Sequence, residues 1–352
     1  MNEKLQWLRN KMSGLNLQGL IISNPINIKY LTNIDAEGTL IITPKENIYI
    51  TDGRYIEQVH SILTLFDEII VYDINDVSKD DYENLFMFCE NVGFEEHYIS
   101  YAEYKDYIRK YKINNFVETE YIIEKQRMIK DEQELSNTIK ACNITDECYK
   151  YILSYIKPGM TEKQIAKEIE DYYCERTDGL SFETIVASGE NSSKPHAVPS
   201  DRKIQEKDII TIDMGCKVNG YCSDMTRTFF VGEPTEEIKR VYDLVLKNQE
   251  FALEQYKDGA STRQITKMVE NDFKLNGYDL IHSLGHGVGL EIHEPPYINY
   301  RNDTALRENM IITDEPGIYI PGKFGVRIED TVQITKFGCV SLTNSDKGYV
   351  II

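Results

Sequence analysis

The sequence predicts a protein of mixed helix and strand with two domains: an N-terminal α/β domain over residues 1–122 and a C-terminal α+β domain over residues 123–352. Three observations support this fold class. The chain has 352 residues, which is longer than a domain with a single hydrophobic core usually is. Short apolar runs alternate with helical segments in the first third of the chain, which is typical of an α/β layer. The rest of the chain contains pairs of similar short sequence segments, which indicate two related halves.

Composition and charge exclude several classes of protein. Hydrophobic residues make up 41% of the chain, but no apolar run is long enough to cross a bilayer, so we expect no membrane insertion. The opening MNEKLQWLRNK lacks an apolar signal core, and the seven cysteines include no C-x-x-C pair. Both features favour a cytoplasmic protein with reduced thiols. The net charge of −19 disfavours nucleic-acid binding and leaves room for metal cations.

The N-terminal domain begins with apolar runs bounded by residues that break regular structure. Three of these runs predict strands, at Gly19–Pro25, Thr39–Pro44 and Asn47–Asp52. Helical segments lie between the runs, and no dense cluster of metal-binding residue types occurs here. We therefore expect the chemistry of the protein to lie in the C-terminal domain.

The C-terminal domain opens with a long helical pattern from about Glu124 to Ile156, which Pro158 and Gly159 interrupt. The next helix starts with a capping box formed by Thr161 and Gln164.

A similar phrase returns about a hundred residues later: GMTEKQIAKEIE at Gly159–Glu170 matches GASTRQITKMVE at Gly259–Glu270. Caps and amphipathic helices constrain sequence, so a match this short also arises by chance. A second match favours duplication, because GYCSDMT at Gly220–Thr226 and GVRIEDT at Gly325–Thr331 share Gly, an acid and Thr in the same places. Each lies after an apolar strand that holds another acid. Two related halves would meet at an approximate two-fold axis, where their acids converge.

The stretch IDMGCKVNGYCSD predicts a β-hairpin with Asn219 and Gly220 in its turn. This turn places Thr226 opposite Asp213, so that Asp213 and Asp224 become diagonal neighbours on one face, with β-carbons about 7 Å apart or less. Two carboxylates shielded from water need a cation. An arginine such as Arg227 is one candidate, and a metal ion is the other.

The second half supplies more ligand-type residues. Glu315 and Glu329 occupy the matching places, and His282, His286 and His293 lie close together in IHSLGHGVGLEIHEPP. Gly285 and Gly287 flank His286 and permit close approach of the backbone to a bound group. Four carboxylates and one imidazole suit two divalent ions of the Mn²⁺ type better than one structural zinc. An EF-hand does not fit, because the acids are spread over more than a hundred residues.

These motifs resemble the pita-bread metallopeptidases, a family that includes aminopeptidase P, prolidase, methionine aminopeptidase and the metal-free creatinase. The resemblance implies a C-terminal pita-bread fold with pseudo-two-fold symmetry and a creatinase-like N-terminal domain for substrate access or dimerisation. TDGRY (Thr51–Tyr55), EPGIYIPG and VRIEDT are similar to the proline-specific branch. The metal ligands implied by the family pattern are all present: Asp213, Asp224, His286, Glu315 and Glu329.

The resemblance also implies roles for the other residues of the site. His196, His293 and Glu315 would be catalytic, and His282, Tyr319 and Arg327 would lie beside the substrate. The implied cofactors are two divalent metal ions, with Mn²⁺ expected and Co²⁺ or Zn²⁺ as alternatives, and a homodimer is expected.

The activity implied by the resemblance is hydrolysis of the bond between an N-terminal residue and proline in a peptide with proline at its second position. Our main prediction is an Xaa-Pro aminopeptidase. The alternative is an Xaa-Pro dipeptidase, or prolidase, which acts only on dipeptides. A non-catalytic peptide-binding module and a metal-free hydrolase on the same fold are less favoured, because the chain keeps every ligand of the family pattern.

Overall fold

The chain divides into two structural units, Met1–Arg127 and Met128–Ile352, each with its own core. The computed structural model describes residues 2–63 and 68–352. We call the units N-terminal and C-terminal. The predicted boundary after residue 122 falls at the start of helix α6 (Ile122–Arg127), which the structure groups with the N-terminal unit.

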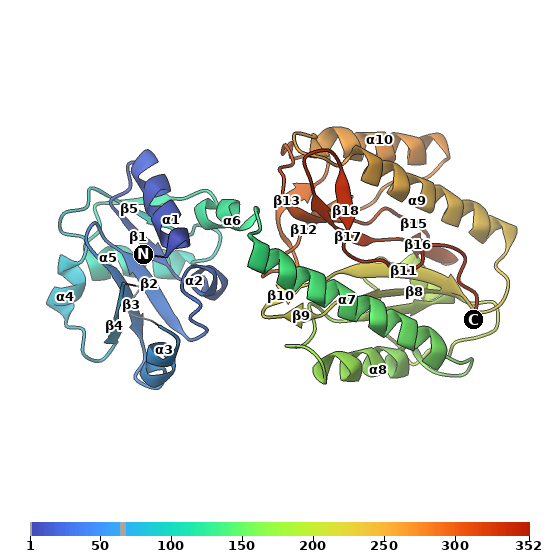
Figure 1. The fold of residues 1–352 in the computed structure, drawn as a ribbon, viewed down its shortest axis with the longest axis horizontal. Helices are drawn as coiled ribbons and strands as arrows, with labels where there is room; N and C mark the ends of the chain where they lie inside the picture. The colour runs from blue at the N-terminus through green and yellow to red at the C-terminus, as the bar shows by residue number, and fades with distance from the viewer. Residues whose placement is uncertain (1, 64–67) are drawn as a thin grey trace. The chain divides into compact units, whose positions relative to one another are not determined.

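A six-stranded mixed sheet forms the centre of the N-terminal unit, in the order β4-β3-β2-β1-β5-β6 (Figure 1). Its strands are β1 (Gly19–Ile22), β2 (Gly38–Ile42), β3 (Asn47–Thr51), β4 (Ile69–Asp73), β5 (Asn91–Phe94) and β6 (Asn115–Glu118). Strands β1, β2 and β3 confirm the three predicted from sequence. The first ends earlier than predicted, because the Asn24 side chain caps the helix that starts at Pro25.

The described part of the unit also contains six helices. They are α1 (Glu3–Gly14), α2 (Pro25–Thr32), α3 (Ile56–Ile62), α4 (Lys79–Asn84), α5 (Tyr101–Tyr111) and α6. Helices α4 and α5 each begin with a capping box, formed by Ser78 with Asp81 and by Ser100 with Glu103. The α/β layer predicted for this part of the chain is therefore confirmed.

The first half of the C-terminal unit consists of two helices and short antiparallel strands. Its elements are α7 (Glu132–Tyr155), α8 (Glu162–Cys174), β7 (Ile185–Ser188), a 3₁₀ turn at Gly189–Ser193, β8 (Ile209–Met214), β9 (Lys217–Val218), β10 (Tyr221–Cys222) and β11 (Met225–Phe230). The prediction of one helix from Glu124 to Ile156 was wrong, because the chain leaves the helical conformation between α6 and α7. There Ile129 forms a β-bridge with Met310, and Asp131 starts α7 with a capping box.

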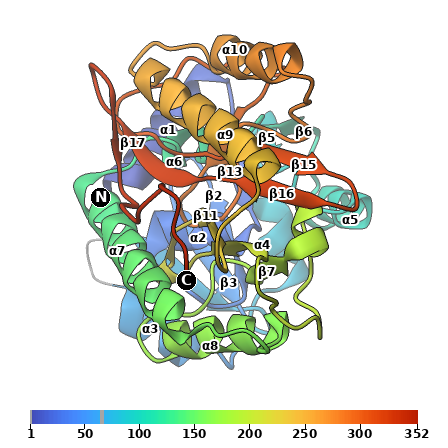
Figure 2. The ribbon, with the colours of Figure 1, turned by 90° about the vertical axis from the view of Figure 1, so that its right-hand side faces the viewer.

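The second half repeats this plan. Its elements are α9 (Glu236–Gln255), α10 (Thr262–Leu275), β12 (Gly285–Gly287), β13 (Glu294–Ile298), β14 (Ile311–Asp314), β15 (Gly317–Ile320), β16 (Phe324–Arg327), β17 (Asp330–Ile334) and β18 (Cys339–Ser341). Figures 1 and 2 show the strands of this unit between the pair α7 and α8 and the pair α9 and α10. None of the helices in the described ranges is both long and apolar enough to cross a bilayer.

Matching backbone contacts support the predicted duplication. Gly159 N donates to Ile204 O over 2.8 Å, and Gly259 N donates to Leu306 O over the same distance. A β-bridge joins Thr161 to Lys203 in the first half, and another joins Ser261 to Ala305 in the second. Both members of the predicted repeat thus cap a helix and pair with a later segment in the same way.

Candidate metal centre

The predicted hairpin is present with its predicted register. Thr226 lies opposite Asp213 in the pairing of β8 with β11, and Val218 lies opposite Tyr221 in the pairing of β9 with β10. The turn residues Asn219 and Gly220 have the positive φ angles that such a tight turn requires. Both Asp213 and Asp224, which directly precedes β11, line one cavity.

The acids of the second half reach the same cavity from the ends of two other strands. Glu315 follows β14, and its backbone N–H donates to Leu284 O over 2.8 Å. Glu329 lies between β16 and β17, and its backbone N–H donates to Thr226 O over 3.1 Å. The structure therefore brings together the four carboxylates that the sequence singled out.

Two threonines of the repeated phrase connect the halves reciprocally. The Thr226 hydroxyl, from the first half, donates to Glu329 Oε2 over 2.7 Å. The Thr331 hydroxyl, from the second half, donates to the backbone oxygen of Asp224 over 2.7 Å. Sequence reasoning assigned no role to these threonines. The signal was available, because each follows its acid at the same spacing in the repeat.

His286 lies in the short strand β12 between two glycines. A β-carbon on Gly285 would lie 2.0 Å from Thr313 O, and one on Gly287 would lie 2.3 Å from Pro295 O. Both glycines allow close backbone approach, and the neighbouring strands β14 and β13 come close at these positions. The glycines thus let β12 fit between β13 and β14, which fixes the position of the His286 ring.

The imidazole of His286 lies among the carboxylates. Its Nε2 atom is 3.5 Å from Asp224 Oδ2 and 3.5 Å from Glu315 Oε1. Among residues 2–63 and 68–352, Asp224, His286 and Glu329 form a buried group with ligand atoms close enough together to hold a metal ion. Asp213 lines the same cavity, and Arg327 Nη2 donates to its Oδ2 over 2.7 Å.

Burial and mutual repulsion shift the protonation of these groups. Burial, followed by neighbouring carboxylates, raises the pKa of Asp224 and of Glu329 well above its ordinary value. Burial also raises the pKa of Glu315 to about 7. Burial, with the ring of His293 nearby, lowers the pKa of His286 to about 3, so this imidazole is neutral near pH 7. A neutral imidazole is the form that binds a metal.

The donor set fits divalent cations. Arg227 was the arginine considered for pairing with the first two acids, but it instead forms an ion pair with Asp330 over 2.6 Å. In the described part of the chain, Arg327 pairs with Asp213, yet Asp213 Oδ1 is buried without a hydrogen-bond partner. One arginine leaves most of the negative charge of four acids uncompensated, so the arrangement suits metal ions better than salt bridges.

The remaining predicted residues surround this centre. His282 Nε2 lies 3.1 Å from the Tyr319 hydroxyl, which accepts a hydrogen bond from Arg327 Nη1 over 2.7 Å. The His293 ring packs edge-on against the His286 ring, with ring centres 4.3 Å apart. His196 comes from the exposed loop after β7. The cavity is lined by His196, His282, His293 and Arg327. Tyr319 lies behind this lining in the sense that its hydroxyl contacts His282 and Arg327.

The cavity has a volume of about 590 Å³, which is within the usual size range of ligand sites. Apolar side chains of Phe182, Ile185, Val198 and Ile292 also line it. Sequence reasoning missed these residues, because nothing in their local pattern distinguishes them from core positions.

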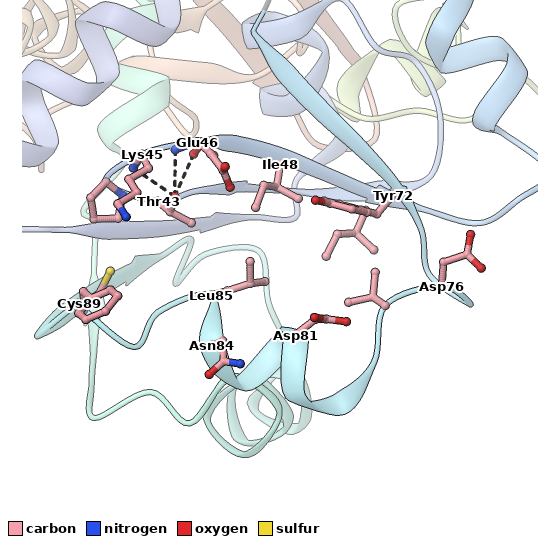
Figure 3. A pocket seen from close by; sticks show the side chains of 14 residues that line it. Thr43, Lys45, Glu46, Ile48, Tyr72, Asp76, Asp81, Asn84, Leu85 and Cys89 are labelled. Carbon is pink, nitrogen blue, oxygen red and sulfur yellow. Dashed lines mark hydrogen bonds between the residues drawn. The ribbon is translucent and has the colours of Figure 1, made fainter.

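Figure 3 shows another cavity, of about 700 Å³, in the N-terminal unit between strand β3 and helix α4. Its walls are mainly apolar, with Ile48, Leu85 and the ring of Tyr72 facing the space. The carboxylates of Asp76 and Asp81 are separate from one another in this view. Without converging ligands this cavity offers no comparable chemistry, so the smaller cavity is the candidate functional site.

Comparisons with known proteins agree with the resemblance seen in the motifs. The profile of metallopeptidase family M24 matches residues 136–336, and that of the creatinase/prolidase N-terminal domain matches residues 4–129. The chain is 35% identical to an Xaa-Pro dipeptidase of Pyrococcus furiosus, over 99% of each chain. It is similar to the solved structure of an Xaa-Pro dipeptidase from Bacillus anthracis, with a TM-score of 0.93, 34% identity and 99% of both chains covered. An X-Pro aminopeptidase structure from Thermotoga maritima has a TM-score of 0.87 and 31% identity, with 97% of this chain and 100% of that chain covered.

Proposed function

Because this chain belongs to metallopeptidase family M24, we propose that it is an Xaa-Pro dipeptidase, which hydrolyses the bond between an N-terminal residue and a C-terminal proline. The observation that carries the proposal is the meeting of four carboxylates and His286 in one cavity, in a chain that matches named Xaa-Pro dipeptidases along its whole length. The relatives favour the dipeptidase alternative over our main prediction of an aminopeptidase. The aminopeptidase remains the second candidate, on the similarity to the Thermotoga maritima structure.

We propose that Asp213, Asp224, His286, Glu315 and Glu329 hold two divalent cations, with Mn²⁺ expected and Co²⁺ or Zn²⁺ as alternatives. Hard oxygen ligands with a single imidazole match the preference of Mn²⁺. Bound divalent ions polarise the scissile carbonyl and lower the pKa of the attacking water.

The protein's own side chains bind and orient the peptide and move protons. His293 and His196 line the cavity, and their proposed role is to donate hydrogen bonds to the charge that develops on the carbonyl oxygen. Glu315 is the carboxylate proposed to carry the proton from water to the leaving nitrogen. Arg327, fixed by Asp213 and Tyr319, offers a positive charge beside the substrate, and His282 is fixed by the same tyrosine hydroxyl.

The proposal is tested with alanyl-proline, alanyl-prolyl-alanine and alanyl-alanine as substrates in the presence of Mn²⁺. A dipeptidase releases alanine from alanyl-proline, releases much less from the tripeptide, and leaves alanyl-alanine nearly intact. Comparable release from the tripeptide would favour the aminopeptidase. No release from any substrate by metal-loaded protein would favour the non-catalytic binding module. We also propose a homodimer, which light scattering on the purified protein tests directly.

A further inference from the structure

The loop between β7 and β8 forms one wall of the candidate site. Loop 189–199 is the first portion of the segment that joins β7 to β8, and its residues 195–199, including His196, line the cavity. Much of this loop is in contact with solvent: His196 is exposed, and Val198 is 78% exposed. A loop with this exposure needs specific anchors to hold one position.

Glu162, the first residue of helix α8, provides an anchor at both ends of this loop. Its side chain is fully buried. Oε1 accepts hydrogen bonds from the backbone N–H and the hydroxyl of Ser188, both over 2.7 Å. Oε2 accepts from the backbone N–H of Ser200 over 3.0 Å and from its hydroxyl over 2.6 Å. The Asn191 amide lies 3.2 Å from both oxygens.

One carboxylate therefore joins the residue before the loop to the residue after it. Burial alone would raise the pKa of Glu162, but the hydrogen bonds from Ser200 and Ser188 hold it below its ordinary value. The group is thus ionised near pH 7, and hydrogen bonds to a charged acceptor are stronger than those between neutral groups. Elsewhere the loop is held by the Ser192 hydroxyl, which accepts from Gly325 N, and by Pro195 O, which accepts from Arg327 Nη1.

We propose that Glu162 is a positioning residue, which fixes the loop 189–199 and thereby holds His196 at the edge of the substrate cavity. In the described part of the chain, its side-chain hydrogen bonds go to the loop and its flanks, and none of the five proposed metal ligands is among the partners. A change at Glu162 should therefore alter the loop without emptying the metal site. The catalytic consequence rests on the proposed function, whereas the consequence for loop mobility does not.

The internal repeat supplies a matched control. Thr262 is the first residue of α10, as Glu162 is of α8, and it is also fully buried. Thr262 N donates to Thr304 O, just as Glu162 N donates to Arg202 O. The Thr262 hydroxyl accepts from Thr304 N over 3.1 Å, and Thr304 lies outside the cavity wall. Thr262→Val thus removes a partly buried hydrogen bond at the equivalent position, and it leaves the residues of the cavity wall unchanged.

The test compares Glu162→Gln, Thr262→Val and the wild type by hydrogen exchange and by metal content. In Glu162→Gln, the side-chain NH₂ group faces the donors of either Ser188 or Ser200, so hydrogen bonds to that serine are lost. Loss of a hydrogen bond to a charged group favours local opening by about 10- to 100-fold. We expect exchange in residues 189–200 to accelerate by that factor in Glu162→Gln and to change less than twofold in Thr262→Val, with the same metal stoichiometry in all three. Unchanged loop exchange in Glu162→Gln would overturn the proposal. If that variant fails to fold, Ser200→Ala removes one donor at the end of the loop and takes its place.

A double-mutant cycle with His196→Ala tests the catalytic consequence. In the wild-type background, Glu162→Gln is expected to lower kcat/KM for alanyl-proline about tenfold or more. In the His196→Ala background it should cost less than twofold, because the loop then carries no imidazole to misplace. An equal loss in both backgrounds would overturn the link to His196. Failure of the wild type to cleave any Xaa-Pro peptide would instead reject the proposed function, and the exchange experiment would still decide whether Glu162 fixes the loop.

Discussion

Metal binding should stabilise the C-terminal unit strongly, and Asp224→Asn should remove that effect. Asp224 is 4% exposed, Glu329 is 1% exposed, and the pKa of each is raised by burial and by neighbouring carboxylates. Arg327 is paired with Asp213, so it does not neutralise the whole set. Divalent cations bound by the folded chain alone would therefore shift the unfolding equilibrium.

The size of the effect follows from mass action. A cation at a free concentration of 1,000 times its Kd stabilises the folded state by about 4 kcal/mol per site. For a unit the size of Met128–Ile352, each kcal/mol raises the Tm by about 2–4 °C. We thus expect Mn²⁺ to raise the Tm of this unit by about 8–16 °C for each site it fills.

The effect of Asp224→Asn on the unfolding temperature should depend on whether metal is present. Without metal, the variant should unfold at or above the wild-type temperature, because an amide replaces one of four crowded acids. With Mn²⁺, most of the wild-type increase should be lost, and activity should fall with the metal content. Asp201→Asn is the matched control, because Asp201 is an aspartate of the same unit with a side chain that is 83% exposed, and its substitution should leave the full increase intact.

Differential scanning calorimetry measures the unfolding transitions, and tryptophan fluorescence identifies which transition belongs to the N-terminal unit. The single tryptophan, Trp7, lies in α1, so its fluorescence reports on the N-terminal unit. An Mn²⁺-dependent increase of equal size in Asp224→Asn and in the wild type would refute the ligand assignment. An absence of any increase in the wild type would refute the metal centre itself.

Three further predictions concern other parts of the molecule. Gly285→Ala places a β-carbon 2.0 Å from Thr313 O, so we expect it to cost about 3 kcal/mol or more in urea denaturation and to weaken Mn²⁺ binding in a metal titration by displacing the adjacent strand. Lys130→Met removes the ammonium that pairs with Glu294 over 2.8 Å, where both side chains are 2% exposed; it should cost about 3–5 kcal/mol, part of which Glu294→Gln restores in the double variant. Burial raises the pKa of Glu95 to about 7, so the folded N-terminal unit binds more protons than the unfolded chain between the ordinary value of 4.5 and 7. The unit should therefore lose up to about 3 kcal/mol as the pH rises through that window, and Glu95→Gln should flatten this slope in denaturation followed by Trp7 fluorescence.

The acids of the site could be predicted from sequence because Asp213 lies in a regular strand and the other three acids lie next to the ends of regular strands. A two-residue turn at Asn219 and Gly220 determines the register of a hairpin, and the observed partner of Asp213 is the predicted one. The repeat then located the corresponding acids of the second half. Where local geometry determines which face of a strand a side chain occupies, a single sequence is sufficient to predict the position of that side chain.

The contacts between the halves could not be predicted in the same way. Arg227 and Arg327 both lie near the acids in sequence, yet the first pairs with Asp330 and the second with Asp213. The choice depends on how two strand pairs pack, and no periodicity encodes that packing. The break between α6 and α7 was missed for a similar reason, because the bridge from Ile129 to Met310 joins segments far apart in the chain.

The reciprocal threonines explain why duplication suits a centre of this kind. Thr226 from the first half orients the Glu329 carboxylate, and Thr331 from the second half holds the backbone of Asp224. A buried carboxylate that keeps a hydrogen-bond donor has less freedom to turn away from its neighbours. Each half thus helps to position an acid of the other half, so neither half alone presents the arranged set of acids. It follows that the proposed metal centre would assemble only when the two halves pack together, and that metal binding would in turn stabilise that packing.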